Sequence, residues 1–441
     1  MQQNKSLPPL FVRVLPPLIA SVFSGTAAAG GFGLYEQNAS GLGNAFAGSA
    51  AVAQDASTIY FNPAGMAMLP GRSFVAGVDV LRTSNEFSNN ASVAAAGRPL
   101  GGNGGDAGGW AGIPFGYLSW QLSPTVFLGV GLGAPFGLKT EYDSGWIGRF
   151  QATKSEIKSI NLNPSLAWKV NDQFSLGFGV SYQRFEAQLG NKVNVLTVVG
   201  GVPVSLGEID AKVTADDDSW GWNFGALFTV SPSTRIGASY RSTIKQKLEG
   251  DVSFGRTGNA AVDAGISANP LLANGPAKAD VKLPDSFILS VVQQLTDKWE
   301  MVGDVVWTGW SNIPRLEIYR TNGALLSVEE LQWDDTWRVA LGGNYKYNDQ
   351  WKIRFGLAFD ESPVNDTYRA PRLPDSDKWW LSIGAQYKPN KDAAIDFAYT
   401  YLIIDDASIN NSRGSVPRYG LINGEYDSST HILGIQYSQS F

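Results

Sequence analysis

Residues 173–183, QFSLGFGVSYQ, alternate large apolar side chains with small or polar ones. Successive side chains of a β-strand point to opposite faces, so this segment presents two faces of different chemistry. One face consists of Phe174, Leu176, Phe178, Val180 and Tyr182, and the other of Gln173, Ser175, Gly177, Gly179, Ser181 and Gln183. The first face suits hydrocarbon, and the second lacks the charge of an ordinary water-facing surface.

The same alternation recurs along the chain from residue 72 onward. Residues 160–169 and 351–360 show the same division into an apolar face and a small or polar face. Strands of a soluble sandwich usually run about 5 to 6 residues, whereas these segments run to ten or more. The pattern therefore favours strands whose apolar faces point outward into a membrane.

Short polar turns divide these segments into hairpins. Typical turn residues occur at Ser123-Pro124, Asn171-Asp172, Ser231-Pro232, Thr296-Asp297, Asn348-Asp349 and Pro389-Asn390. Six hairpins contain twelve strands. One further strand at each end, at about 72–84 and 429–441, brings the predicted number to fourteen and places both chain ends on the short-turn side.

Seven longer segments separate the hairpins, at roughly 88–109, 134–154, 190–209, 251–279, 311–331, 361–376 and 406–428. Short turns on one rim, long loops on the other and an even strand number are typical of bacterial outer-membrane barrels. The barrel must close, because an open sheet edge in hydrocarbon leaves backbone groups unpaired at several kcal/mol each. We therefore predict an all-β, 14-stranded antiparallel transmembrane β-barrel in the Gram-negative outer membrane, surrounded by lipid and lipopolysaccharide.

The composition argues against most other classes of protein. Charged residues make up 17% of the 441 residues, against about 25% in soluble domains, and no segment beyond the N-terminus approaches the roughly 18 apolar residues of a membrane helix. With no cysteine and one histidine, His431, the chain offers little for a disulfide, a zinc site or a catalytic triad. We expect no catalytic residues, no metal and no cofactor. The net charge of −6 argues against nucleic acid as a partner.

The first 29 residues read as a secretory signal peptide. Lys5 and Arg13 precede an apolar stretch and the small-residue run Ala27-Ala28-Ala29, which predicts cleavage before Gly30. Because this segment holds two positive charges and no acid, its removal moves the net charge from −6 to −8.

Residues 30–70 break the alternating pattern. They are rich in alanine, glycine and serine, whose side chains are too small to form a lipid-facing surface. A fourteen-stranded barrel has an interior large enough to need filling. We therefore expect three parts: a signal peptide at 1–29, an N-terminal hatch that plugs the lumen at 30–70, and the barrel at 71–441.

Aromatic residues lie where the two membrane interfaces are expected. Trp120, Trp168, Trp299, Trp351 and Tyr387 lie near the short turns, and Trp307, Trp310, Trp333 and Trp379 near the long segments. The last strand places on one face Leu433, Ile435, Tyr437 and the terminal Phe441. This end resembles the signal of barrels inserted by the outer-membrane assembly machinery, so we expect that machinery as a partner during biogenesis.

Several short motifs lie outside the strand pattern. They are Ser40-Gly41-Leu42-Gly43-Asn44-Ala45, Asp55-Ala56, Asn62-Pro63-Ala64, Ala134-Pro135-Phe136-Gly137-Leu138, Gly148-Arg149-Phe150, Leu283-Pro284-Asp285-Ser286 and Leu373-Pro374-Asp375. Together they resemble the long-chain fatty acid transporter family of outer-membrane proteins, which also includes transporters of aromatic hydrocarbons. The resemblance implies a fourteen-stranded barrel plugged by an N-terminal hatch. It further implies that hydrophobic ligands enter between the outer loops, bind in the lumen and leave sideways.

The exit in that family is an opening in the wall where the third strand bends inward. The resemblance therefore assigns the lateral opening here to Gly129, Gly131, Gly133, Ala134 and Pro135. Glycine lets a strand bend and a hatch backbone approach closely, and proline cannot donate a ladder hydrogen bond. The alternative interpretation is that these inward glycines only make room for the hatch.

Gate and head-group residues follow as hypotheses. The start of the hatch would close the pocket from below, with Phe32 as the apolar contact, and a second set would hold the hatch near the opening. The first set is Gly31, Phe32, Gly33 and Leu34, and the second is Asn62, Pro63 and Ala64. The inward-facing Arg241 and Arg338 are candidates for binding a fatty acid carboxylate, with lumenal salt bridges as their alternative role.

The resulting functional prediction is transport of hydrophobic compounds, long-chain fatty acids first, by binding in the plugged lumen and lateral diffusion. Uptake of monoaromatic hydrocarbons is the alternative, and it needs no carboxylate partner. An outer-membrane lipase or protease is disfavoured because no nucleophile motif accompanies His431. A general porin is a further alternative. Ion conductance distinguishes it, because the predicted hatch implies a low conductance.

Overall fold

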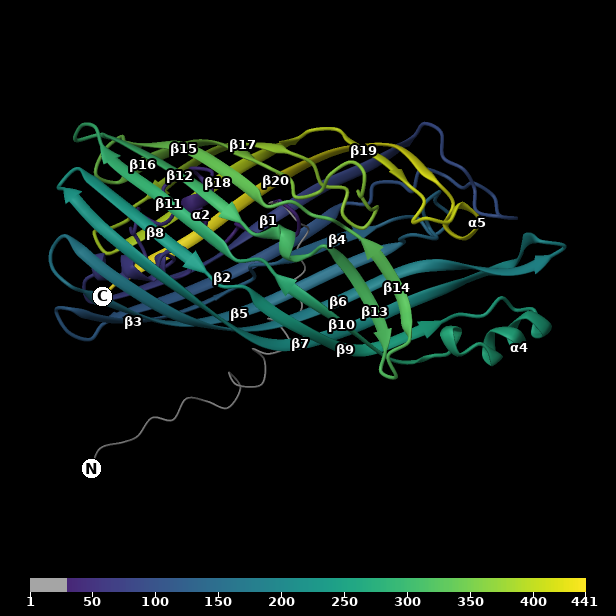
Figure 1. Ribbon diagram of the computed structural model, residues 1–441. Helices are drawn as coiled ribbons and strands as arrows, with labels where there is room; N and C mark the ends of the chain where they lie inside the picture. Colours follow the sequence, from purple (N-terminus) through teal and green to yellow (C-terminus); the bar gives the residue numbers. More distant parts are fainter. Residues whose placement is uncertain (1–29) are drawn as a thin grey trace, which may run out of the picture.

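A computed structural model describes residues 30–441 of the chain, so the predicted signal peptide at 1–29 lies outside the described residues. From residue 72 onward the chain forms one antiparallel sheet that closes on itself (Figure 1). The first strand pairs with the last, from Ser73 opposite Ser440 to Asn89 opposite Gly424. The predicted closed barrel of fourteen strands is confirmed.

Several barrel strands are interrupted, so the fourteen positions comprise more than fourteen strand segments. In chain order they are β1 (Arg72–Asn89), β2 (Gly109–Gln121), β3 (Val126–Gly133) with β4 (Gly137–Glu141), β5 (Lys154–Lys169), β6 (Phe174–Val199), β7 (Val202–Ser231), β8 (Thr234–Arg241) with β9 (Ile244–Phe254), β10 (Gly275–Leu283) with β11 (Ser286–Gln294), β12 (Trp299–Thr308), β15 (Thr336–Lys346), β16 (Trp351–Asp360), β17 (Lys378–Tyr387), β18 (Ala393–Ile404) with β19 (Ala407–Asn411), and β20 (Ile422–Ser440).

All six predicted short turns join neighbouring strands of the barrel. They connect β2 to β3, β5 to β6, β7 to β8, β11 to β12, β15 to β16 and β17 to β18. These turns lie at one rim, together with the C-terminus (Figure 1). The other rim, the long-loop rim, holds the longer connections.

Some predicted long loops contain regular structure instead. Residues 190–209 belong to β6 and β7, which stay paired as far as Val199 opposite Val202. Above the bilayer both faces of a strand meet water, so the apolar alternation disappears although the backbone pairing continues. Other elements in these connections are α4 (Ala260–Ala268), η2 (Pro270–Leu272), η3 (Trp310–Asn312), β13 (Arg315–Arg320), β14 (Leu325–Glu330) and α5 (Val416–Tyr419).

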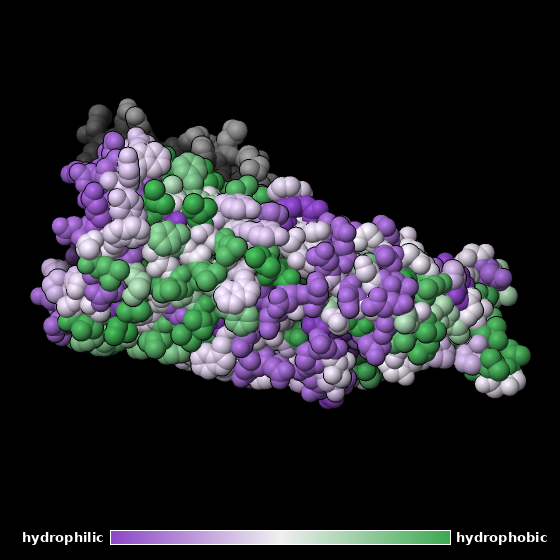
Figure 2. All heavy atoms as spheres, turned by 90° about the horizontal axis from the view of Figure 1, so that it is seen from above, coloured by the Kyte–Doolittle hydropathy of each residue, from purple (hydrophilic) through white to green (hydrophobic). Residues whose placement is uncertain are grey.

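The strand faces point as the alternation predicts. On β16, Phe355 and Leu357 are each 44% exposed, whereas Arg354 and Ala358 are buried. Hydrophobic residues gather over the half of the barrel next to the short turns, and hydrophilic residues become more abundant toward the long-loop rim (Figure 2). None of the helices in residues 30–441 is long and apolar enough to cross a membrane.

Two of the predicted belt tryptophans do not face lipid. Trp120, Trp168, Trp299, Trp351 and Trp379 are exposed, but Trp310 and Trp333 are only 2% and 6% exposed. Their rings pack 5.5 Å apart in an edge-on arrangement. This part of the prediction is wrong because both indoles pack inward, against each other and against Phe32.

The N-terminal segment, residues 30–69, contains three short helices: α2 (Ala39–Leu42), α3 (Thr58–Phe61) and η1 (Pro63–Met68). The side chain of Asn38 accepts a hydrogen bond from the Gly41 amide, and that of Asn62 accepts one from the Ala64 amide. Both are N-cap interactions, and a proline at the first position of η1 suits a helix start.

This segment packs against the inward faces of the strands. Its apolar residues join barrel residues in one buried cluster that includes Phe46, Val302 and Trp380. The Ala39 amide donates to Gln436 of β20 at 3.1 Å, and Arg354 of β16 donates to the Ser40 carbonyl at 3.1 Å. Small residues allow this contact because the space between opposite walls has to be shared with the strands' own side chains.

Candidate functional site

The backbone ladder of the barrel is interrupted beside the third strand. β2 pairs with β3 only from Gly116 opposite Leu132 to Gln121 opposite Phe127. Beyond that point β4 pairs with β5 alone, and within residues 30–441 no β4 residue pairs with residues 109–115 of β2. The two sides meet again where the Glu141 amide donates to the Ala107 carbonyl at 3.0 Å.

The interruption coincides with a bend at residues 134–136, where the chain leaves the strand conformation. Pro135 has no amide to donate to a ladder. The N-terminal segment bonds to this bend: the Leu34 amide donates to the Pro135 carbonyl at 2.9 Å, and the Gly137 amide donates to the Phe32 carbonyl at 3.0 Å. The Gln37 side chain donates to the Ala134 carbonyl at 2.8 Å. The fold thus brings the predicted gate residues Phe32 and Leu34 to Ala134 and Pro135 of the predicted lateral opening.

The three glycines of β3 line the inside directly below the bend. A Cβ atom at Gly129 would lie 2.5 Å from the sulfur of Met66, and one at Gly133 would lie 2.3 Å from the side chain of Gln37. A Cβ at Gly131 would meet the Tyr117 ring at 2.9 Å. These contacts support the interpretation that the glycines make room for the N-terminal segment, while the bend itself begins at Ala134.

Asn62, Pro63 and Ala64 lie elsewhere than expected. The Asn62 side chain donates to the Ala226 carbonyl of β7 at 2.9 Å, and Ser175 of β6 donates to the Ala64 carbonyl at 3.0 Å. This motif therefore fixes the segment to β6 and β7, not to the bend. The residues of the segment that reach β3 are Gln37, Ile59 and Met66.

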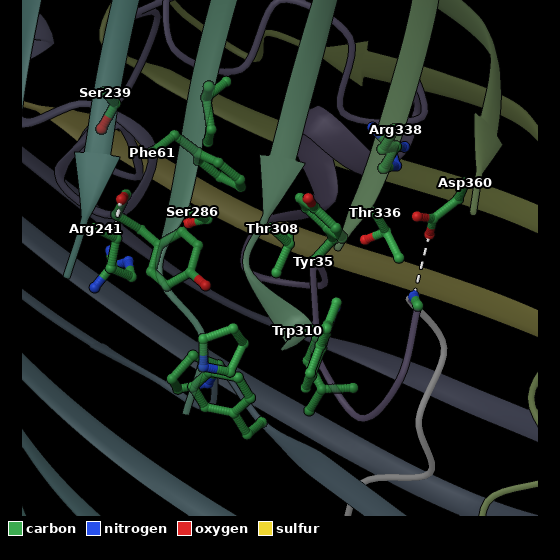
Figure 3. A pocket seen from close by; sticks show the side chains of 18 residues that line it. Tyr35, Phe61, Ser239, Arg241, Ser286, Thr308, Trp310, Thr336, Arg338 and Asp360 are labelled. Atoms are coloured by element: carbon green, nitrogen blue, oxygen red, sulfur yellow. Dashed lines mark hydrogen bonds between the residues drawn. The ribbon is translucent and has the colours of Figure 1, made fainter. Parts of the chain in front are cut away.

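A cavity of about 800 Å³, the arginine cavity, lies between the N-terminal segment and the strands. Its lining brings together Gly33, Leu34, Pro135, Arg241 and Arg338, which come from four separate parts of the chain. In Figure 3 the two arginines lie on opposite sides of the cavity. The sequence predicts separate roles for these residues, and the fold places them around one cavity.

Arg338 is engaged by protein groups. It is 2% exposed, donates to the Ala45 carbonyl at 2.6 Å and lies 3.8 Å from the carboxylate of Asp304. Its guanidinium also stacks over the rings of Tyr35 and Trp380. These contacts are those of a lumenal ion pair, the alternative role considered for it.

Arg241 has a different environment. It donates to the Tyr60 carbonyl at 2.8 Å and to the Ser181 hydroxyl at 3.3 Å, and it lies over the Tyr60 ring at 4.4 Å. Among residues 30–441 no carboxylate forms an ion pair with it. Among the described residues, its charge is therefore balanced only by neutral acceptors.

A second, larger cavity of about 1020 Å³, the apolar cavity, is lined almost entirely by aliphatic and aromatic side chains. Phe32 lines it, while its neighbours Gly33 and Leu34 line the arginine cavity. The Phe32 ring packs against Trp310, Trp333 and Phe136 at 5.0 to 5.8 Å, so it forms part of the partition between the two cavities.

Sequence reasoning missed the groups that hold the start of the segment. The Gly30 amide donates to Asp360 at 3.3 Å (Figure 3), and the Gly31 amide donates to Asp375 at 2.8 Å. Asp375 belongs to the Leu373-Pro374-Asp375 motif, for which the sequence predicts no individual role. No local signal indicates that Trp310 and Trp333 would meet Phe32, because these contacts join residues about three hundred positions apart.

Comparisons with known proteins agree with one another. A family model described as outer membrane protein transport protein (OMPP1/FadL/TodX) matches residues 20–441. The chain is 28% identical to the long-chain fatty acid transport protein of Escherichia coli K12 over 456 residues, 98% of this chain and 99% of that one. It is 30% identical to outer membrane protein P1 of Haemophilus influenzae over 410 residues, 86% of this chain and 87% of that one.

Solved structures share the architecture. A Pseudomonas aeruginosa FadL homologue, 27% identical, covers 93% of this chain and 100% of its own with a TM-score of 0.88. The Pseudomonas putida toluene transporter TodX, 16% identical, covers 88% of this chain and 94% of its own with a TM-score of 0.64. At that identity the second likeness concerns the fold alone.

Proposed function

The chain belongs to the outer membrane transport protein family (OMPP1/FadL/TodX), and from this premise we propose that it carries long-chain fatty acids across the outer membrane. As a member it is an outer-membrane transporter of hydrophobic compounds. The observation that supports the finer proposal is the adjacency of the apolar cavity to the arginine cavity, where Arg241 has no acidic partner among the described residues.

The energetics fit a ligand with a long apolar tail. Each buried methylene is worth about 0.8 kcal/mol, so a sixteen-carbon tail has on the order of 12 kcal/mol of preference for apolar surroundings. The apolar cavity provides such surroundings, and Arg241 provides a charge-assisted hydrogen bond for the carboxylate. Because transfer of the tail into apolar surroundings is favourable, transport needs a gate and no energy input.

The gate in this proposal is the start of the N-terminal segment. Phe32 separates the two cavities, and Leu34 is bonded to the bend. A ligand that displaces Phe32 reaches the arginine cavity, whose lining includes Pro135 and Phe136. From there it would leave sideways through the ladder interruption between β2 and β4, directly into the bilayer.

The test is uptake of labelled oleate by cells that lack their own fatty acid transporter and produce this chain. We expect uptake by the unaltered protein, and faster uptake by Phe32→Ala because the partition is smaller. Heat-modifiable electrophoretic mobility would verify that each variant is inserted. Unchanged uptake by both Phe32→Ala and a deletion of Phe32 would discard the gate.

Uptake of monoaromatic hydrocarbons is the second candidate. It is favoured by the lining of the apolar cavity, which includes few charged groups and would accept a neutral ring without any head-group partner. Growth of the same cells on toluene, without uptake of oleate, would replace the fatty acid proposal with this one.

A further inference from the structure

The barrel wall has a second interruption, between β10 and β13. β10 is paired with β9 along its whole length, from Gly275 opposite Val252 to Leu283 opposite Ile244. On its other edge, within the described residues, it pairs with β13 at only two positions, Ala277 and Lys278. The wall closes again where Ser286 of β11 lies opposite Thr308 of β12.

The cause lies in the prolines and the short helix on either side of the interruption. Pro284 ends β10 and has no amide, and on the facing chain η3 and Pro314 replace the strand conformation. Side chains bridge the interval: Lys282 donates to Asn312 at 2.5 Å, and Asn312 donates to Asp285 at 3.1 Å. Such side-chain bridges can open without breaking a backbone ladder.

The apolar cavity runs along this interruption. Its lining includes Ala279 and Val281 from the β10 edge and Leu316 and Ile318 from the β13 edge. Lys278, whose side chain is exposed on the outer surface, also lines it. The cavity therefore extends to the wall at the level of Lys278.

The outer surface changes character at the same level. On β11, Phe287, Leu289 and Val291 are exposed and form part of the apolar belt. On β10, just beyond it, the outward side chains are Lys282, Asp280 and Lys278. The interruption thus begins where lipid tails give way to head groups.

Two like charges face each other at this boundary. Lys282 of β10 lies in register with Lys245 of β9, whereas the next outward pairs are Asp280 with Lys247 and Lys278 with Glu249. Like charges directly opposite each other on one face destabilise a sheet. An anionic group held between Lys245 and Lys282 would relieve that repulsion.

We propose that this interruption is a side entrance, at which Lys245 and Lys282 hold the carboxylate of a fatty acid in the outer leaflet while its tail passes between β10 and β13 into the apolar cavity. The inference rests on the proposed fatty acid function and adds a route and a recognition site to it. A single-chain anionic amphiphile fits, because the interruption lies between only two strand segments, β10 and β13, and the charged pair lies at its lower end.

The entrance can be closed by a crosslink. The chain has no cysteine, so Asp280→Cys with Glu317→Cys places a unique pair of thiols on the outward face across the interruption, and a short bismaleimide would join them. Gln188→Cys with Thr214→Cys is the matched control, since these residues are partners in a fully paired stretch of β6 and β7. We expect the first crosslink to reduce initial oleate uptake about tenfold and the control crosslink to leave it unchanged.

The lysine pair is tested separately. Lys245→Gln with Lys282→Gln is expected to slow oleate uptake about tenfold, the usual cost of losing hydrogen bonds to a charged group, and to leave uptake of the neutral oleyl alcohol unchanged. Lys247→Gln, which faces Asp280, is the control. If the unaltered protein takes up oleate and neither the crosslink nor the lysine change slows it, the entrance is wrong and the proposed function stands. If the unaltered protein takes up no oleate, the proposed function itself fails.

Discussion

Arg241 and Arg338 line the same cavity, but replacing them would cost the protein different amounts of stability. Arg338 is paired with the buried Asp304, and removing one partner of a buried ion pair leaves an uncompensated charge at a cost of about 3 to 5 kcal/mol. Arg241 has neutral partners only. One arginine therefore supports the interior of the barrel, and the other is the one that we propose as the partner of a ligand.

We predict that Arg241→Gln weakens oleate binding about tenfold without lowering the thermal stability of the barrel, whereas Arg338→Gln lowers the stability. Isothermal titration of detergent-solubilised protein and thermal unfolding would measure the two effects. Equal loss of stability in both variants would contradict the distinction.

Glu36 is fully buried, and neither of its carboxylate oxygens accepts a hydrogen bond from the described residues. Burial raises its pKa from 4.5 to about 7 and Asp360 reinforces the rise, while the residue's own backbone amide, Arg338 and Lys378 oppose it. Because the folded pKa lies above the unfolded one, the stabilising contribution is complete below pH 4.5 and is lost as the pH rises through 7.

We predict that Glu36→Gln stabilises the N-terminal segment at pH 8 by on the order of 3 kcal/mol and reduces the change in its stability between pH 5 and pH 8. Hydrogen exchange of residues 30–69 at both pH values would measure this. The exposed Glu425→Gln is the control. The explanation fails if the unaltered segment is equally protected at pH 5 and pH 8.

At the scale of elements, the N-terminal segment and the strands fit because glycines of the strands leave space for it. A Cβ atom at Gly177 of β6 would lie 2.2 Å from the backbone nitrogen of Ala64. The clash is with backbone, so the segment and the strand would have to separate. At Gly116 of β2 the nearest atom would be 3.8 Å away.

We predict that Gly177→Ala displaces η1 from β6 at a cost of about 1 to 3 kcal/mol and raises the ion conductance of the barrel in planar bilayers. Gly116→Ala, in the same barrel, is expected to leave the conductance at the level of the unaltered protein. Equal conductance of all three proteins would show that this contact does not restrain the segment.

At the scale of the whole molecule, closure of the barrel does not depend on the N-terminal segment. β1 and β20 pair over their whole facing length, so neither terminal strand leaves a free backbone edge in lipid. Inward arginines such as Arg354, which is bonded to the segment and to Asp396, would be hydrated if the segment were absent. The barrel therefore has the parts it needs to fold alone.

We predict that deletion of residues 30–69 yields an inserted barrel with heat-modifiable mobility, a high ion conductance and no saturable uptake of oleate. Conductance and uptake measured on the same preparation would check this. An uninserted or unfolded product would show that the segment is needed for assembly of the barrel.

The alternation of side chains is enough to predict the number of strands, the positions of the turns and the face on which each side chain lies. These features depend on neighbours one or two residues apart and on the apolar surface that lipid requires. The same local reasoning erred where that demand ends: at β6 and β7 above the bilayer, and at Trp310 and Trp333, which turn inward. The position of Asn62 against β7, the partition at Phe32 and the different surroundings of Arg241 and Arg338 were settled only by the closed barrel. Each of them joins residues far apart in the chain, and it is the curvature and stagger of the ring that determine which inward side chains meet.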